Sequence, residues 1–397
     1  DKAFKSPKAD KFEPIARVEA VDPRTVRFHL KRAYAPILAD LSISIVPASR
    51  ARMPGARAQD RTPIGAGPFR FISQPDEEHL ELAPFDGYHG GKPALSALHF
   101  RVVRDETTRV LEMMKGRADL AFNVVSPAVI PLLSKQPRLR VLSKPGTGYA
   151  YVVLNTRSGP TADARVRQAV CHALAVDEIV EHKFHGLAVP ATGMLPKDHW
   201  AYAPTPGCQR DLEKAGRLLD EAGYPARAGK PRLTLTLKTS TDRFRKSIGL
   251  VFKEELAKAG IEVEVRSLEF GTLLNDMRRG NFELGTLKWA SVIEPDLLRQ
   301  VFSSQYIPSQ ANGFGGLNRG GYQNPEVDEL LAKASVSSME ERKAQYAEAL
   351  RLIDRDVPYV PLWHESSVAV VSDRLQDFTP SAHGFLRPLA NAREVAR

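Results

Sequence analysis

The sequence predicts a mixed α/β protein with more than one lobe. The chain has 397 residues, which is more than one small hydrophobic core usually organises, so two or three lobes are expected. Residues 233–287 give the clearest pattern, in which segments of period-two alternation are separated by segments of helical periodicity. The resulting strand–helix–strand–helix–strand order favours a largely parallel sheet.

Each element of that pattern has its own signal. Apolar residues alternate in 233–237 and again in 261–265, as in strands with one buried face. The first helix is expected to stop at Gly260, and the last strand to run from Phe282 to Leu287. The apolar positions that define the two helices are Phe244, Ile248, Val251, Phe252 and Leu256 for the first, and Leu273, Leu274 and Met277 for the second.

Other segments flank this core. Strands are expected at Val26–Leu30 and Tyr149–Leu154, and two late helices at about 326–335 and 340–355. A helix is also expected from Thr107 to Lys115, with Thr107 or Thr108 as its candidate cap. Aspartate is common at the start of a helix. The aspartates expected to begin helices are Asp163, Asp177 and Asp211.

Composition excludes several classes of protein. The chain is 43% hydrophobic and 26% charged, as ordinary globular proteins are. The net charge of +9 comes from Lys and Arg scattered along the chain, so no nucleic-acid partner is expected. No run of 18 apolar residues occurs, so no membrane-spanning helix is expected. Residues 1–8 are polar and basic and lack the features of a signal peptide, which indicates a processed chain or a piece of a longer one.

The two cysteines, Cys171 and Cys208, are too few for a disulfide framework or a zinc site. Cys171 lies among apolar residues of an expected helix. A buried free thiol is therefore favoured there over a bridge to Cys208, which stays the alternative.

No local motif indicates catalysis. The segment Gly65-Ala66-Gly67 lacks the third glycine of a dinucleotide fingerprint, and no serine lies in a Gly-x-Ser-x-Gly elbow. His182 and His185 have no partner at metal-ligand spacing, so solvated histidines are expected. The sequence therefore predicts a protein that is not an enzyme and that needs no cofactor or metal.

Several short motifs occur along the chain in an order found in one family, in residues 63–69, 85–88, 92–93, 165–169, 215–224, 289–296, 324–328 and 357–361. Together they resemble the bacterial extracellular solute-binding proteins of the peptide/nickel class, family 5, which serve ABC transporters and include the dipeptide- and oligopeptide-binding proteins. The family usually begins with a Leu-Asp-Pro strand that is not found here, so the first lobe is expected to be incomplete.

The resemblance implies a periplasmic-binding-protein-like clamp of class II type, with two lobes and a hinge. Residues 1–62 would be a remnant of the extra subdomain of lobe one, and 63–153 lobe one itself. Residues 154–371 would form lobe two, and 372–397 would return to lobe one. A solute would bind between the lobes.

The resemblance also indicates candidate ligand-binding residues. In peptide-binding relatives an acidic residue receives the peptide's amino terminus, and Glu294 stands at that place; the alternative is a charge at a helix start, with Asp296 capping the helix. Arg319 is a candidate for pairing with a ligand carboxylate, or else a solvated loop arginine. Tyr149 and Tyr151 are two apart on a strand, so they should face the same side. The remaining candidates are Trp289, Asn318 and Trp200.

The implied function is the substrate-binding component of an ABC importer, which captures a peptide or other small solute and delivers it to permease subunits in the membrane. The expected location is the periplasm, or an extracytoplasmic site with a lipid anchor, and a monomer is expected. The alternative is the ligand-sensing domain of a regulator with the same fold.

Overall fold

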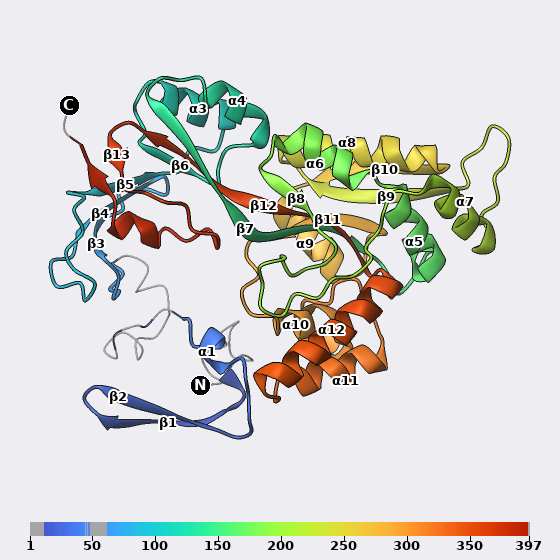
Figure 1. Cartoon of the computed structure of the whole chain (residues 1–397), viewed down its shortest axis with the longest axis horizontal. Helices are drawn as coiled ribbons and strands as arrows, with labels where there is room; N and C mark the ends of the chain where they lie inside the picture. The colour runs from blue at the N-terminus through green and yellow to red at the C-terminus, as the bar shows by residue number, and fades with distance from the viewer. Residues whose placement is uncertain (1–11, 44, 46, 48–61, 396–397) are drawn as a thin grey trace. The chain divides into compact units, whose positions relative to one another are not determined.

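The computed structural model describes residues 12–43, 45, 47 and 62–395. It divides into two compact units (Figure 1). Unit 1 comprises the described residues of Asp1–Ser42, Thr147–Val180 and Pro190–His364, and unit 2 those of Ile43–Gly146, Glu181–Val189 and Glu365–Arg397. Two long strands, β7 (Leu139–Leu154) and β12 (Tyr359–Ser372), contribute residues to both units. The lobe ranges expected from the sequence stay a prediction.

The sheet of unit 1 is built around the predicted strand–helix–strand repeat. Strand β9 (Leu233–Ser240) lies between β10 (Ile261–Leu268) and β11 (Leu284–Trp289) and is parallel to both. The connecting helices α8 (Arg243–Lys258) and α9 (Phe270–Arg278) lie on opposite faces of these strands in Figure 1, which is the arrangement that right-handed crossovers give for this strand order. The parallel α/β prediction is confirmed, and the antiparallel pairing of β11 with β7 makes the sheet mixed.

The local sequence explains these elements. Leu233, Leu235 and Leu237 alternate and are all buried, so one face of β9 packs into the core. Asp242 caps α8 by accepting a hydrogen bond from the backbone N–H of Arg245 at 2.9 Å. The turn between α8 and β10 contains Gly260, whose positive φ of 80° is a conformation that glycine adopts without a steric penalty.

A helical layer completes unit 1. It contains α10 (Leu297–Phe302), α11 (Pro325–Ala334) and α12 (Met339–Asp356), and the two late helices match their predicted ranges within two residues. Three further helices lie between β7 and β9 in the chain: α5 (Ala164–Ala173), α6 (Val176–Phe184) and α7 (Leu212–Glu221). The predicted aspartate caps of α5 and α7 are confirmed, and Asp177 lies in the first turn of α6.

An N-terminal hairpin belongs to unit 1. It consists of β1 (Ile15–Asp22) and β2 (Thr25–Leu30), followed by the short α1 (Ile37–Asp40). The backbone N–H of Ala35 donates to the carbonyl of Ser335 at 2.8 Å, which ties this segment to the end of α11.

Unit 2 contains a three-stranded antiparallel sheet of β3 (Phe69–Ser73), β4 (His79–Pro84) and β5 (Leu98–Arg101). Its remaining elements are α3 (Glu106–Met114), β6 (Leu120–Phe122), α4 (Ile130–Leu133), β13 (Leu375–Gln376) and β14 (Arg393–Glu394). Strand β6 and the short β8 (Ala188–Pro190) each pair with β12. The prediction of a threonine cap for α3 is wrong, because Asp105 caps this helix by accepting from the N–H of Thr108 at 2.8 Å.

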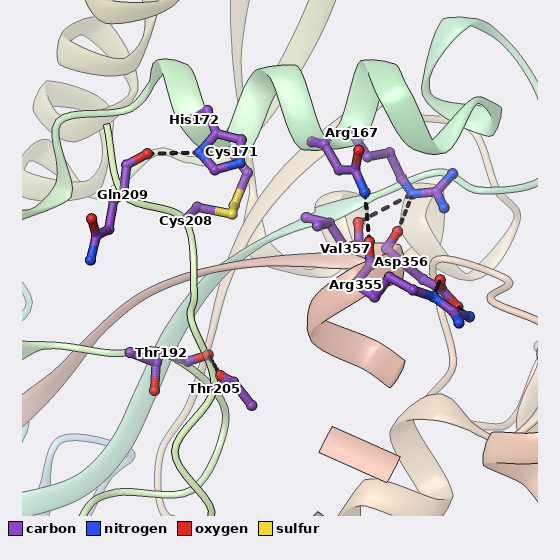
Figure 2. The surroundings of a disulfide bond; sticks show 11 residues. Arg167, Cys171, His172, Thr192, Thr205, Cys208, Gln209, Arg355, Asp356 and Val357 are labelled. Atoms are coloured by element: carbon purple, nitrogen blue, oxygen red, sulfur yellow. Dashed lines mark hydrogen bonds and ion pairs between the residues drawn. A yellow bond between two sulfur atoms is a disulfide. The ribbon is translucent and has the colours of Figure 1, made fainter. Parts of the chain in front are cut away.

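Cys171 and Cys208 form a disulfide, with their Cα atoms 5.5 Å apart, so the prediction of a free thiol is wrong (Figure 2). The loop around Cys208 runs beside α5, where Asp211 N–H donates to the carbonyl of His172 at 2.8 Å and the His172 ring bonds the carbonyl of Gln209 at 2.7 Å. These contacts hold the loop next to the helix and bring the two sulfur atoms together.

No helix in the described part of the chain combines the length and the apolar character that crossing a membrane requires.

Candidate ligand-binding site

The paired strands β7 and β11 bring three predicted aromatic residues together. In their register Trp289 lies opposite Tyr149, and Leu287 opposite Tyr151. The rings of Tyr149 and Tyr151 stack at 5.4 Å, which confirms that the two side chains share one face of β7. Tyr151 also stacks on Trp289 at 6.5 Å and on Tyr359 of β12 at 4.4 Å. We call these four residues the aromatic stack.

Most of the aromatic stack is deeply buried. Tyr149, Tyr151 and Tyr359 are no more than 5% exposed, and Trp289 is partly buried. Burial raises the pKa of Tyr359 to about 12, and it also raises the pKa values of Tyr149 and Tyr151 above their usual range. The three hydroxyl groups therefore stay protonated at neutral pH. The indole Nε1 of Trp289 is buried and has no hydrogen-bond partner among the described residues.

Arg319 places a buried positive charge beside this stack. Its side chain is 8% exposed, and its guanidinium carbon lies 5.5 Å from the centre of the Trp289 ring. The Nε atom has no hydrogen-bond partner, and no carboxylate of the described residues forms an ion pair with the guanidinium. Arg319 is therefore not the solvated loop arginine that was the alternative. The arrangement is a cation on an aromatic face without a counter-charge.

Asn318 fixes the loop that carries Arg319. Its side-chain N–H groups donate to the carbonyls of Ser303 and Tyr322 at 3.1 and 2.8 Å. Its side-chain oxygen accepts from the backbone N–H groups of Gly321 and Tyr322 at 3.1 and 3.0 Å. Because these four bonds use the full capacity of the amide, Asn318 serves to position the loop and has no group left for a ligand.

Glu294 is paired within the protein. Its carboxylate forms an ion pair with Arg342 of α12, which is 5% exposed. Burial raises the pKa of Glu294, and the neighbouring Arg342 opposes that shift. The guanidinium carbon of Arg342 lies 5.0 Å from the centre of the Trp200 ring and 5.6 Å from that of Tyr346. Glu294, Arg342 and these two rings form one compact group, which we call the Glu294–Arg342 group.

Asp296 is also paired. Both of its oxygens accept hydrogen bonds from Arg299, at 2.9 and 2.8 Å, and the Asp296 side chain is almost completely buried. It makes no capping hydrogen bond at the start of α10, so the prediction that it caps this helix is wrong. Asp296 does not cap the helix because Arg299, three residues later, competes for its carboxylate. The Arg299 guanidinium offers two charge-assisted hydrogen bonds in place of one bond from a backbone N–H.

The structure thus places seven of the eight predicted residues in two groups, and the eighth, Asp296, next to the second group. Tyr149, Tyr151 and Trp289 lie in the aromatic stack with Arg319 and its anchor Asn318. Trp200 and Glu294 lie in the Glu294–Arg342 group, and Asp296 stands next to it. Sequence reasoning missed Arg342 and Tyr359. The available signal for Arg342 was its position on the apolar stripe of a predicted helix, four residues before Tyr346.

Unit 2 holds a groove of about 750 Å³, and five of its charged lining side chains are paired with one another. Glu112 pairs with Arg101 at 3.0 Å and with Arg117 at 3.3 Å, and Asp119 pairs with Arg374 at 2.6 Å. None of the eight predicted residues lines it. In the described part of the chain, no group of three His, Cys, Asp or Glu side chains is arranged to hold a metal.

The fold resembles solved proteins that bind a small solute. The nickel–histidine complex of NikZ from Campylobacter jejuni superposes with a TM-score of 0.87 at 24% identity, covering 99% of this chain and 82% of that one. AppA from Bacillus subtilis, an oligopeptide-binding protein solved with a nonapeptide, gives a TM-score of 0.85 at 24% identity, covering 100% of this chain and 81% of that one. Both show a common fold, which is that of the two-lobe solute-binding proteins.

The family follows from the sequence comparison. The model described as bacterial extracellular solute-binding proteins, family 5 Middle, matches residues 1–306. This chain belongs to that family, whose members are substrate-binding proteins of ABC importers, and the predicted resemblance and fold are confirmed.

Related proteins differ in the solutes they are named for. Heme-binding protein A of Haemophilus influenzae is 27% identical over 95% of this chain and 70% of that protein. A probable di/tripeptide-binding protein of Pseudomonas aeruginosa is 30% identical over 81% of this chain and 60% of that protein. The glutathione-binding protein GsiB of Escherichia coli is 29% identical over 92% of this chain and 72% of that protein. All three are named as binding proteins, and none as an enzyme or a regulator.

Proposed function

We propose that this chain captures a peptide or another small solute outside the cytoplasm and delivers it to the permease subunits of an ABC importer. Membership of family 5 supports the importer role. We further propose that the solute binds at the aromatic stack and Arg319, with the Glu294–Arg342 group beside it.

The observation that carries the site is Arg319, which is 8% exposed, forms no ion pair with a carboxylate of the described residues and leaves its buried Nε without a hydrogen-bond partner. Removing a charge from water costs several kcal/mol unless an opposite charge or hydrogen bonds compensate. A protein fold gains no stability from such a group, so a ligand that supplies the missing partner accounts for it. The Trp289 ring, which is the partly exposed member of the aromatic stack, offers apolar and π surface for the rest of the solute.

The location outside the cytoplasm has a second, independent support. The Cys171–Cys208 disulfide is of a kind that persists in oxidising compartments and is rare in the reducing cytosol. The periplasm, or an extracytoplasmic surface reached through a lipid anchor, fits both this bond and the family. We propose a monomer as the working state.

Thermal-shift screening with di- and tripeptides, glutathione, haem and nickel–histidine, followed by native mass spectrometry, tests this function. A solute at 100 times its Kd should stabilise the protein by about 2.7 kcal/mol, because it binds only the folded state. The Arg319→Met protein should lose that stabilisation, while the Arg279→Met protein, altered at an exposed arginine that stacks on Phe314 at 4.6 Å, should keep it. A solute that stabilises all three proteins equally would contradict the proposed site.

A further inference from the structure

The turn at the end of α12, residues 356–358, has an unusual backbone conformation, and we call it the α12 turn. Val357 ends the helix with a positive φ of 45° and is 4% exposed. Glycine usually adopts this left-handed conformation, whereas the branched Cβ of valine opposes it. Pro358 adds to the strain, because a residue before proline favours an extended backbone. The turn therefore needs contacts from outside it to hold this conformation.

Arg167 of α5 supplies these contacts, as Figure 2 shows for the α12 turn. Its Nε donates to the carbonyls of Asp356 and Val357 at 2.9 and 3.2 Å. Its Nη1 donates to the carbonyls of Thr161 and Ala162 at 3.0 and 2.8 Å. The arginine is 6% exposed, so these bonds are shielded from water. One buried guanidinium thus ties the α12 turn to the segment before α5.

The next residue of α5 extends this contact. Gln168 Nε2 donates to the carbonyl of Arg355 at 2.8 Å. The last carbonyls of a helix carry the negative end of its dipole, which the Arg167 cation stabilises. Arg167 and Gln168 belong to one of the motif segments, residues 165–169, and their side chains cap the C-terminal end of α12.

On one side the α12 turn leads directly into the aromatic stack. The Pro358 carbonyl accepts from the N–H of Leu154 at 3.1 Å, which fixes the start of β12 beside β7. Tyr359, the first residue of β12, stacks on Tyr151 at 4.4 Å. Because Tyr359 is two residues beyond Val357, a change in the φ of Val357 would redirect the Tyr359 ring.

On the other side the α12 turn holds the loop that carries Arg319. Asp356 Oδ2 accepts from the Tyr322 hydroxyl at 2.7 Å and from Asn324 Nδ2 at 2.9 Å. The backbone of Tyr322 is in turn bonded by the Asn318 amide. The α12 turn therefore connects the Arg319 loop with the aromatic stack.

We infer that Arg167 is a positioning residue for the candidate site. It holds the α12 turn in the left-handed conformation, and the turn sets the place of Tyr359 and of the Arg319 loop. The effect of Arg167 on solute binding rests on the proposed function, whereas its effect on the α12 turn does not.

Four proteins test the inference without a solute: the wild type, Arg167→Met, Val357→Gly and the double variant. The readouts are near-ultraviolet circular dichroism and the hydrogen exchange of the peptide that contains Leu154. In Arg167→Met the Leu154 amide should exchange at least about tenfold faster, because the turn that carries its acceptor opens locally. The near-ultraviolet signal should fall as the aromatic stack loses its fixed geometry.

The double variant separates positioning from general stability. Glycine adopts the left-handed conformation readily, so Val357→Gly should restore most of the Leu154 protection and aromatic signal that Arg167→Met loses. The Tm should not recover, because Val357→Gly also removes a buried side chain. Two results would overturn the inference: a double variant that matches Arg167→Met in both readouts, or an Arg167→Met protein that keeps both wild-type values.

Two controls are matched to these changes. Arg165→Met removes an exposed arginine of the same helix, and Asp242→Ala removes the cap of α8. Both should leave the Leu154 exchange at the wild-type rate, although Asp242→Ala should lower the Tm. If Arg167→Met does not fold, Arg167→Lys takes its place, because lysine keeps the charge but replaces the two bonding nitrogens with one.

A binding measurement uses the di- and tripeptides and the glutathione of the thermal-shift screen. Those that bind the wild type should bind Arg167→Met about three- to thirtyfold more weakly, and the double variant should recover most of that loss. An unchanged affinity in Arg167→Met would overturn the role of Arg167 in the site. A wild-type protein that binds none of the screened solutes would instead contradict the proposed function, and the solute-free readouts would still decide the role of Arg167 in the α12 turn.

Discussion

Glu294 and Arg342 form an ion pair beside the ring of Trp200, although 48 residues separate them in the chain. The pair joins the segment before α10 to the first turn of α12. It also engages Oε1 of the carboxylate that the sequence motif suggested for a peptide's amino terminus. Several testable consequences come from this pairing and from the contacts around it.

Removing Arg342 alone should destabilise the protein more than removing both partners. Arg342→Met leaves the partly buried Glu294 without a counter-charge, and we expect a loss of about 3 kcal/mol in the free energy of unfolding. The double variant Arg342→Met with Glu294→Gln should recover at least half of that loss, because no unpaired charge remains. Urea unfolding of the four proteins of this cycle measures both values. Additive losses would show that the pair is not coupled.

The Cys171–Cys208 disulfide should stabilise unit 1 substantially. The bond closes a loop with a sequence separation of 37 residues, for which the chain-entropy model predicts about 4 kcal/mol. Reduction by dithiothreitol should therefore lower the urea midpoint of the wild-type protein. The control is the Cys171→Ala, Cys208→Ala protein, whose midpoint should not respond to dithiothreitol. An equal response of both proteins would attribute the effect to something other than this bond.

His364 should make stability fall in mildly acidic solution. The residue is 6% exposed, its ring nitrogen Nδ1 bonds the carbonyl of Gly148 at 3.2 Å, and burial lowers its pKa below the usual 6.5. The unfolded chain then binds a proton near pH 6.5 that the folded chain does not, so stability is lost as the pH falls below that value. Chemical unfolding from pH 7.5 to 5 should show this loss, and the His364→Gln protein should show less of it. Identical slopes for the two proteins would contradict the assignment.

Asn318→Ala should disturb both stability and binding. It removes four buried hydrogen bonds and leaves their backbone partners unsatisfied, for which we expect a loss of about 3 kcal/mol. Asn318→Asp is the matched control, since it keeps the size and the acceptor but loses the two donors. We expect it to be at least as unstable as the alanine variant in urea unfolding, because a buried carboxylate oxygen would face the carbonyls of Ser303 and Tyr322. A fully stable Asn318→Ala protein would show that another contact holds the loop.

Local patterns predicted the parallel strands and the late helices because their periodicity reports which face is buried. The period of two along a strand likewise placed Tyr149 and Tyr151 on one side. The disulfide was missed because Cys208 lies in a loop without a periodic signal, so nothing local indicates its distance from Cys171. The pairing of Asp296 with Arg299 was missed because an aspartate before a helix is expected to act as a cap.

The unpaired state of Arg319 could not be predicted for a related reason. A glycine-rich loop predicts an exposed side chain, whereas the amide of Asn318 turns this loop into the core of unit 1. Whether a charge has a partner depends on contacts between segments that are distant in sequence. Ion pairs of this kind, including Glu294 with Arg342, come only from the folded structure.

The most direct test of the account is the affinity of Arg319 variants for a solute with a free carboxylate, measured by isothermal titration calorimetry. Arg319→Met should bind at least about tenfold more weakly than the wild type, because it removes the charged hydrogen bonds to the carboxylate. The Arg279→Met control should bind like the wild type. An unchanged affinity in Arg319→Met would contradict the central claim that this buried guanidinium holds the solute.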